Sequence, residues 1–242
     1  MTGQAKDANG GAKGRLDWVD AAKGLGIILV VIGHVWTSGA VRDTIYAFHM
    51  PLFFLLAGYF AQPRPMRECA GRQWRSLAVP YISFLLVLTL ADQVIEHLRG
   101  VLPLIRDWRG AARAFLLGGT ELRGPLTIFW FVSCLAIGRL IQNGLFCLWP
   151  DPRDWKWAAA MAVMLALGMG LGSISDVSPL GLLTVPVAVV LLWLGALWRM
   201  LERDSALLIG GLVVSLGVLA VMRPVPLEMK MGDYGVPGLS LG

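Results

Sequence analysis

Long apolar segments alternate with short polar connections along most of the 242-residue chain. Each has the length of about 17 to 25 residues that a helix needs to cross a bilayer. Because hydrocarbon offers backbone groups no partners, such segments must be helical. The pattern predicts an all-α, polytopic transmembrane helix bundle of about seven or eight spans, with segments near 22–40, 44–61, 78–96, 125–149, 157–174, 178–200 and 205–222.

The amino-acid composition supports a membrane protein. Apolar residues make up 56% of the chain and charged residues 15%, which is typical of polytopic membrane proteins rather than soluble domains. The net charge of +5 is explained by basic connections between spans, so we expect the lipid bilayer and no nucleic acid as partner. Cys69, Cys134 and Cys147 lack the spacing of metal ligands or redox pairs, so no metal site is predicted.

The basic residues also predict the orientation. In an arrangement of seven spans, the short basic connections all fall on the side of the N-terminus, which the positive-inside rule places in the cytoplasm of a cell with an inner membrane. The exception is the stretch 97–124 with its five arginines, where Ala111 to Leu117 is expected to form an interfacial helix or part of a short extra span. The basic residues of this side include Lys6, Lys13, Arg15, Lys23, Arg64, Arg67, Arg72, Arg75, Arg153, Lys156, Arg199 and Arg203.

The two ends of the chain differ in composition from the spans. Residues 1–14 have too little apolar content to pack, so we expect a disordered cytoplasmic tail. Residues 15–242 are predicted to form one membrane domain. The polar stretch after Arg223 begins to turn apolar just as the sequence stops, and we therefore expect this domain to be incomplete at its C-terminus.

Ionisable residues lie inside the first two apolar segments. Lys23 and His34 are eleven positions apart, so they share one helix face, about 20° apart in azimuth and about 16 Å apart along the axis. Asp20 falls within about 40° of that face. His49 follows at a similar depth in the second segment, and the two imidazoles are expected to meet. Such groups are costly in a membrane and therefore indicate a functional site.

Simpler explanations exist for both histidines. His34 could be a buried imidazole bonded to a carbonyl of a neighbouring helix, although a charged residue on the same face favours a general base. For His49 the two explanations are balanced, because Pro51 could kink the helix and leave a carbonyl that the imidazole satisfies.

Arginines form the second group of candidates. Arg72 and Arg75, one helical turn apart, could grip the phosphates of a cytoplasmic donor, since planar guanidinium groups match phosphate oxygens. They could equally form a topogenic cluster that touches anionic lipid headgroups. Arg139 lies well inside the fourth segment and needs a partner or a water-filled cavity, which makes it a secondary candidate.

Several ordered motifs resemble the integral-membrane acyltransferases of acyltransferase family 3, especially the fucose 4-O-acetylase-like branch. The likeness covers residues 15 to 140 well and the remainder loosely. Its motifs are Trp18-Val19-Asp20-Ala21-Ala22-Lys23-Gly24, Val31-Ile32-Gly33-His34, Phe48-His49-Met50-Pro51-Leu52-Phe53-Phe54, Gly58-Tyr59-Phe60, Arg72-Gln73-Trp74-Arg75, Pro80-Tyr81 and Phe129-Trp130-Phe131.

This resemblance implies that an acyl group, commonly acetyl from acetyl-CoA, is moved from the cytoplasmic side to a hydroxyl of a glycan or similar acceptor. In the family, a basic residue before a helix histidine marks the active centre; Lys23 and His34 match it, with Lys where many relatives have Arg. A paired-arginine motif is matched by Arg72 and Arg75. By analogy His34 is the base or acyl-handling residue, the arginines help hold CoA, and no cofactor is permanently bound.

Two other functions remain open. Family members usually have about ten spans, so the chain could be a fragment or a shortened, inactive form. Alternatively, Lys23, His34 and His49 could form the proton or substrate path of a transporter or exporter subunit. An inverted repeat would favour the transporter, but the second half of the sequence has no counterpart of the histidine hairpin.

Overall fold

The computed structural model describes residues 17–36, 39–100, 107–118, 122, 124–172, 178–201 and 229. These residues contain α-helices, short helical turns and connections, and no β-strand. The predicted all-α bundle is therefore confirmed. The helices are α1 (Asp17–Val35), α2 (Ala40–Tyr59), α3 (Met66–Gln73), α4 (Val79–Leu98), α5 (Trp108–Leu117), α6 (Trp130–Leu148), α7 (Trp155–Gly172) and α8 (Val185–Leu201), with the short turns η1 (Trp74–Ala78), η3 (Gly124–Phe129) and η4 (Pro179–Gly181).

The predicted spans agree well with these helices. Five helical stretches of the described residues are long and apolar enough to cross a membrane, and α2 adds a further helix of 20 residues to the bundle. A helix is also present where one was expected within 97–124, as α5. The predicted span 205–222 and the tail 1–14 lie outside the described residues. The five stretches are Trp18–Val35, Met66–Leu98, Leu126–Leu148, Trp155–Gly172 and Pro179–Leu201.

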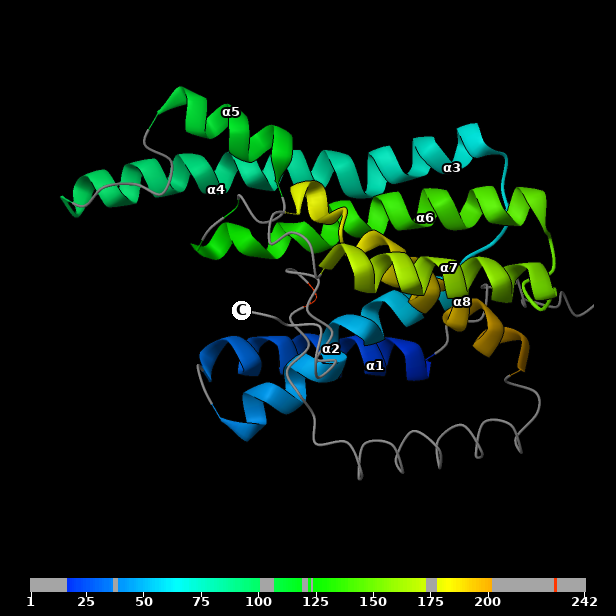
Figure 1. Cartoon of the computed structure of the whole chain (residues 1–242). Helices are drawn as coiled ribbons and strands as arrows, with labels where there is room; N and C mark the ends of the chain where they lie inside the picture. The colour runs from blue at the N-terminus through cyan, green and yellow to red at the C-terminus, as the bar shows by residue number, and fades with distance from the viewer. Residues whose placement is uncertain are drawn as a thin grey trace, which may run out of the picture.

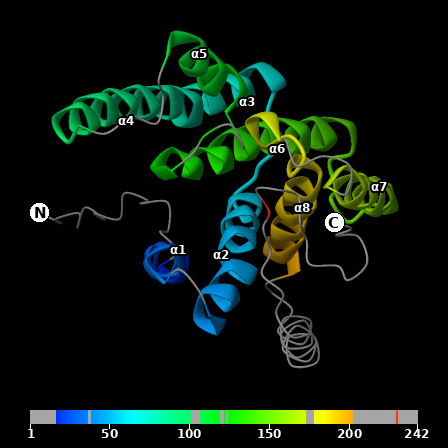
Figure 2. The same cartoon turned by 60° about the vertical axis from the view of Figure 1, so that its left-hand side comes forward.

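Helices α2 and α8 pack against each other at the centre of the bundle (Figure 1). Helix α1 covers α2, whereas α6 and α7 pack against α8, and α3 runs beside α6 (Figure 2). The helices alternate in direction, so α1, α3 and α7 begin at the end of the bundle where α2, α6 and α8 finish. We call this the arginine-rich end, because it carries Arg64, Arg67, Arg72, Arg153 and Arg199. The other is the opposite end.

The core lies between α2, α6, α7 and α8. Its buried apolar side chains include Phe54, Cys134, Phe146, Trp157 and Val189. The outward faces of α1 and α4 are also apolar, with Leu25, Ile28 and Leu90 among the exposed side chains. In a soluble protein such faces would mark docking surfaces, whereas in a bundle with this composition they are the surface that lipid tails cover.

Two glycines allow α2 and α8 to approach closely. A Cβ atom at Gly58 would overlap the backbone carbonyl of Leu192 in α8, and one at Gly195 would overlap the carbonyl of Leu55 in α2. Small residues at such crossings let helix backbones pack directly, which is a main source of helix association in membranes. The buried Gln142 of α6 donates a hydrogen bond of 2.9 Å to the same Leu192 carbonyl, so three helices meet there.

The third span is one helical stretch of 33 residues, Met66–Leu98, with a π-helical turn, η1, inside it. Pro80 explains this turn, because proline has no N–H group and leaves the carbonyl four positions earlier, at Ser76, without its usual donor. A π turn accommodates such a defect by widening the helix locally. The angular register of α3 is therefore shifted relative to α4.

We expect Gly58→Ala and Gly195→Ala each to destabilise the bundle, because a methyl group at either position must push α2 and α8 apart. The loss of unfolding free energy should be about 1–3 kcal/mol, the usual cost of overpacking. Thermal unfolding in detergent measures it. Gly24→Ala is the matched control, since a Cβ there meets nothing within 4 Å. Unchanged melting of both central variants would contradict the close packing of α2 and α8.

Candidate functional site

Helices α1 and α2 form the hairpin that carries both candidate histidines. The chain reverses at Gly39, whose φ of 101° is readily adopted only by glycine. Next to His34, Gly33 lets α1 come close to α2: a Cβ at this position would lie 3.0 Å from Ile45 and 3.3 Å from Tyr46. The close approach places His34 directly against the second helix.

The two imidazoles are joined through Tyr46. His34 Nδ1 lies 3.3 Å from the Tyr46 hydroxyl oxygen, and the ring centroids are 5.9 Å apart. On its other side, the Tyr46 ring makes an edge-to-face contact with His49 at 5.0 Å. The expectation that the histidines meet is therefore corrected in one respect: they belong to one cluster, but a tyrosine separates them. We call this group the His34–Tyr46–His49 cluster.

The two histidines of the cluster differ in exposure and in bonding. His49 is buried, and its Nδ1 lies 2.8 Å from the backbone carbonyl oxygen of Ile45. A carbonyl only accepts, so Nδ1 carries the proton and Nε2 keeps a lone pair when the ring is neutral. This contact is the carbonyl bond considered for His49, although its acceptor is Ile45 rather than the carbonyl four positions before Pro51. His34 is exposed and therefore accessible to a ligand.

Lys23 and Asp20 lie on α1 at the arginine-rich end of the bundle. The Lys23 Nζ is 3.9 Å from Asp20 Oδ1 and sits 5.0 Å from the centroid of the Phe60 ring at the end of α2. Both Lys23 and His34 thus face α2, as their helical spacing predicted. They stay about 16 Å apart along α1, so neither Lys23 nor Asp20 reaches the histidine cluster.

A second polar site lies at the arginine-rich end, between the end of α2, the start of α3 and the inner part of α6. It is an open pocket of about 40 Å³. We call it the arginine pocket. Its lining consists of Phe60, Ala61, Gln62, Arg64, Cys69, Arg72, Gln73, Arg139, Gln142, Asn143 and Phe146.

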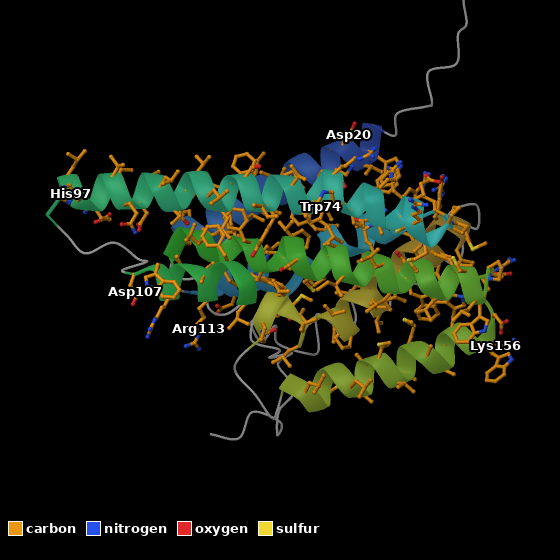
Figure 3. The ribbon with its side chains drawn as sticks, turned by 90° about the horizontal axis from the view of Figure 1, so that it is seen from above. Asp20, Trp74, His97, Asp107, Arg113 and Lys156 are labelled. Carbon is orange, nitrogen blue, oxygen red and sulfur yellow. The ribbon has the colours of Figure 1, made fainter. Side chains whose placement is uncertain are left out.

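The structure separates the two arginines of the pair predicted to bind phosphate. Arg72, in α3, lines the pocket, whereas Arg75 is exposed and is not part of the lining. The reason is the π turn, which begins at Trp74, between the two arginines, and changes the angular spacing there. Trp74 marks this junction in Figure 3. Arg139, the secondary candidate, lines the same pocket as Arg72.

Asn143 fixes the wall of the arginine pocket that connects α2 and α3. Its Oδ1 accepts a hydrogen bond of 3.0 Å from the Arg64 N–H, and its Nδ2 donates one of 3.0 Å to the Arg64 carbonyl. The Arg64 guanidinium forms an ion pair with Glu68 at 2.5 Å. Within the described part of the chain, Arg72 and Arg139 form no ion pair with a carboxylate.

Sequence reasoning did not single out Tyr46 or Arg42. The Arg42 guanidinium lies over the Tyr46 ring, 4.4 Å from its centroid, and also pairs with Asp43 at 3.5 Å. A positive charge therefore borders the histidine cluster at the opposite end of the bundle. The spacing of Tyr46, three positions before His49, was the available signal, since such residues share a helix face.

The histidine cluster and the arginine pocket lie at different depths of one helix. His49 and Phe60 are eleven positions apart in α2 and its cap, which corresponds to about 16 Å along the axis. Phe60 lines the arginine pocket and also receives the Lys23 ammonium. The arrangement can bind an anionic group at the arginine-rich end while proton transfer takes place deeper in the bundle.

Comparison with known proteins gives a family match. The model of acyltransferase family 3, described as an acyltransferase domain, matches residues 16–241. Nodulation protein NolL of Mesorhizobium japonicum is 28% identical to the chain over 149 residues, which are 54% of this chain and 37% of that protein. Nodulation protein NolL of Sinorhizobium fredii is 30% identical over 173 residues, 65% of this chain and 43% of that protein.

The chain thus spans about two fifths of the length of the curated relatives it matches. No solved structure matches it significantly.

We expect Asn143→Ala to loosen the wall of the arginine pocket, because it removes both hydrogen bonds to the Arg64 backbone, each worth about 1 kcal/mol. Cys147 reports on this change, since its Sγ contacts the Arg64 carbonyl at 3.5 Å and is exposed. Its maleimide labelling in membranes should become several-fold faster. Cys147→Ser identifies the labelled site, and an unchanged rate in Asn143→Ala would show that Asn143 does not hold the connection.

Proposed function

The chain belongs to acyltransferase family 3, and from this membership we propose that it acts as a membrane O-acyltransferase. It moves an acyl group, acetyl in the simplest case, from cytoplasmic acyl-CoA to a hydroxyl of a cell-surface glycan or a related acceptor. The observation that carries this proposal is the His34–Tyr46–His49 cluster, two imidazoles joined by a tyrosine inside one membrane hairpin.

Acyl transfer from a thioester to a hydroxyl needs one group that accepts and returns a proton. An imidazole suits this role, since its ordinary pKa lies near neutral pH. The ring nitrogen takes the proton of the acceptor hydroxyl as the oxygen attacks the thioester carbonyl carbon. The carbon–sulfur bond then breaks, the CoA sulfur leaves with the electron pair, and the imidazolium returns the proton to it.

We assign the base to His34, because it is the exposed member of the cluster. When His34 donates its Nδ1 proton to the Tyr46 oxygen, its Nε2 is free to accept the proton of the acceptor. His49 lies behind Tyr46, buried and held by the Ile45 carbonyl, and it keeps the tyrosine ring in place through their edge-to-face contact. Tyr46 is therefore a positioning residue that sets the tautomer of His34.

The donor's phosphates are proposed to bind at the arginine-rich end, with Arg72 in the pocket and Arg75 beside it. The pantetheine arm of CoA is an extended chain that separates the thioester from the phosphates. It matches the separation of about 16 Å along α2 between the pocket and the histidine cluster. Lys23, over the Phe60 ring that lines the pocket, stands beside this path, with Asp20 as its counter-ion.

The orientation in the membrane follows from the distribution of charge. Basic connections favour the cytoplasmic side, so the arginine-rich end would face the cytoplasm, together with the N-terminus. In this orientation CoA enters from its own compartment, and the acceptor approaches His34 from the opposite side of the inner membrane.

A proton or substrate path through Lys23, His34 and His49, as in a transporter, is the competing function. The geometry does not favour it, because the residues of α1 between Lys23 and His34 are all apolar or glycine. A proton path needs polar groups or water along its length. Acyl transfer needs no such continuous path, since the pantetheine arm carries the reactive group.

The first test uses the complete open reading frame in membranes with radiolabelled acetyl-CoA, and follows the label into glycan. We expect His34→Ala to insert normally and to lose transfer by about 100-fold or more, since a general base contributes at least that factor. His97→Ala is the matched control, because His97 is exposed at the far end of α4 (Figure 3). Retained transfer in His34→Ala would refute the assigned base, and no transfer by the native protein would favour the transporter or an inactive fragment.

A second test removes only the hydroxyl of Tyr46. We expect Tyr46→Phe to lower kcat by about tenfold with little change in KM for acetyl-CoA, because His34 loses the partner that sets its tautomer while the donor site is untouched. Tyr59→Phe makes the same chemical change at the other end of α2, where the ring packs against Trp18 at 5.4 Å. Equal kcat values for native protein and Tyr46→Phe would remove Tyr46 from the mechanism.

A further inference from the structure

Arg139 is the charged residue that the proposed reaction has not yet used. It lies within α6, nine positions before the end of that helix, which places it about 14 Å inside the span. A guanidinium at such depth is costly unless it is paired or reaches a polar cavity. Arg139 reaches a cavity, because it lines the arginine pocket.

The charges around Arg139 make the pocket electrostatically unfavourable when it is empty. The charged side chains that act on Arg139 are Arg72 and Arg64, which are both positive. Arg64 is neutralised by Glu68, but Arg72 and Arg139 have no carboxylate partner among the described residues. Like charges facing one pocket repel each other, and the repulsion is relieved when an anion binds between them.

Arg72 and Arg139 approach the pocket from opposite walls at a similar depth. Asn143 of α6 lies level with Met66 of α3, since its Nδ2 is 4.0 Å from the Met66 sulfur. From that level, Arg72 is six positions further along α3 and Arg139 is four positions further along α6, about 9 Å and about 6 Å. Two planar forks on facing walls are suited to bind one phosphate group between them.

The walls of the pocket are held rigidly enough to keep this geometry. Asn143 fixes the Arg64 backbone with two hydrogen bonds, and the buried Gln142 is tied to the Leu192 carbonyl of α8. Gln73, also buried, adds a neutral polar side chain to the lining. A site of this kind binds an anion without first having to order its own side chains.

We propose that Arg139 and Arg72, on two different helices, together bind a phosphate group of the acyl-CoA donor, and that Arg139 rather than Arg75 is the second cation of this site. The assignment rests on the proposed acyltransferase function. The same phosphate chemistry could be supplied by the headgroup of an anionic lipid, and the experiment must distinguish these two sources.

The experiment measures CoA binding to the purified full-length protein in zwitterionic nanodiscs, together with steady-state transfer. We expect Arg139→Gln to weaken CoA binding and to raise KM for acetyl-CoA by about 10- to 100-fold, the range for a lost hydrogen bond to a charged group, with kcat little changed. Arg139→Lys, which keeps the charge without the fork, should fall between. Arg67→Gln is the matched control, an exposed arginine of α3 outside the lining.

Acetyl-pantetheine, which carries the thioester but no phosphate, separates the phosphate contact from the rest of the donor site. Native protein and Arg139→Gln should use it with equal kcat/KM. If Arg139→Gln binds CoA as the native protein does while transfer proceeds, the inference about Arg139 is wrong and the proposed function stands. If the native protein neither binds CoA nor transfers acetyl groups, the proposed function itself fails.

Two further measurements cover a lipid ligand and a variant that does not fold. If phosphatidylglycerol nanodiscs raise the melting temperature in an Arg139-dependent manner and abolish CoA binding, the occupant is a lipid headgroup and the assignment to the donor is overturned. In the native protein, Cys69 lines the pocket, so CoA should slow its reaction with a small thiol reagent several-fold, while acetyl-pantetheine and the exposed Cys147 show no such effect. Absence of this protection would overturn the proposal without any variant.

Discussion

The backbone carbonyl of Leu192 is the point on which the arrangement of both sites depends. Gly58 of α2 packs directly against it, and Gln142 of α6 donates a hydrogen bond to it, so three helices are joined at one atom group. Helix α2 carries the tyrosine and one histidine of the cluster, and Gln142 belongs to the lining of the arginine pocket. Because membrane helices have little hydrophobic drive to associate in lipid, close backbone packing and a buried hydrogen bond of this kind must fix their relative positions.

Much of the fold was predictable because a membrane limits the possible structures. Apolar length alone located every span within the described residues, and helical periodicity placed Lys23 and His34 against the same neighbour. Two features were not predictable from periodicity. Tyr46 resembles any aromatic residue near a span end, and its position between the histidines depends on how closely Gly33 lets the helices approach. The separation of Arg72 from Arg75 depends on a π turn, which a regular 3.6-residue period cannot represent.

The two sites use the membrane in different ways. The arginine pocket is open and lies where charged groups can still reach water, so cations can wait there without a fixed counter-ion. The histidine cluster lies deeper, where each polar atom must find a partner within the protein, and His49 does so through the Ile45 carbonyl. An acyl-CoA donor suits this division, since its charge and its reactive carbon lie at opposite ends of a long neutral arm.

The π turn at Trp74–Ala78 has a consequence for how related chains can be compared. A π turn is equivalent to one residue inserted into an α-helix, and that residue rotates everything before it by about 100° relative to everything after it. A relative lacking one residue in this short stretch would align almost perfectly in sequence. Its two arginines would nevertheless lie on a different side of the third span relative to Tyr81, so the same motif letters would not describe the same pocket.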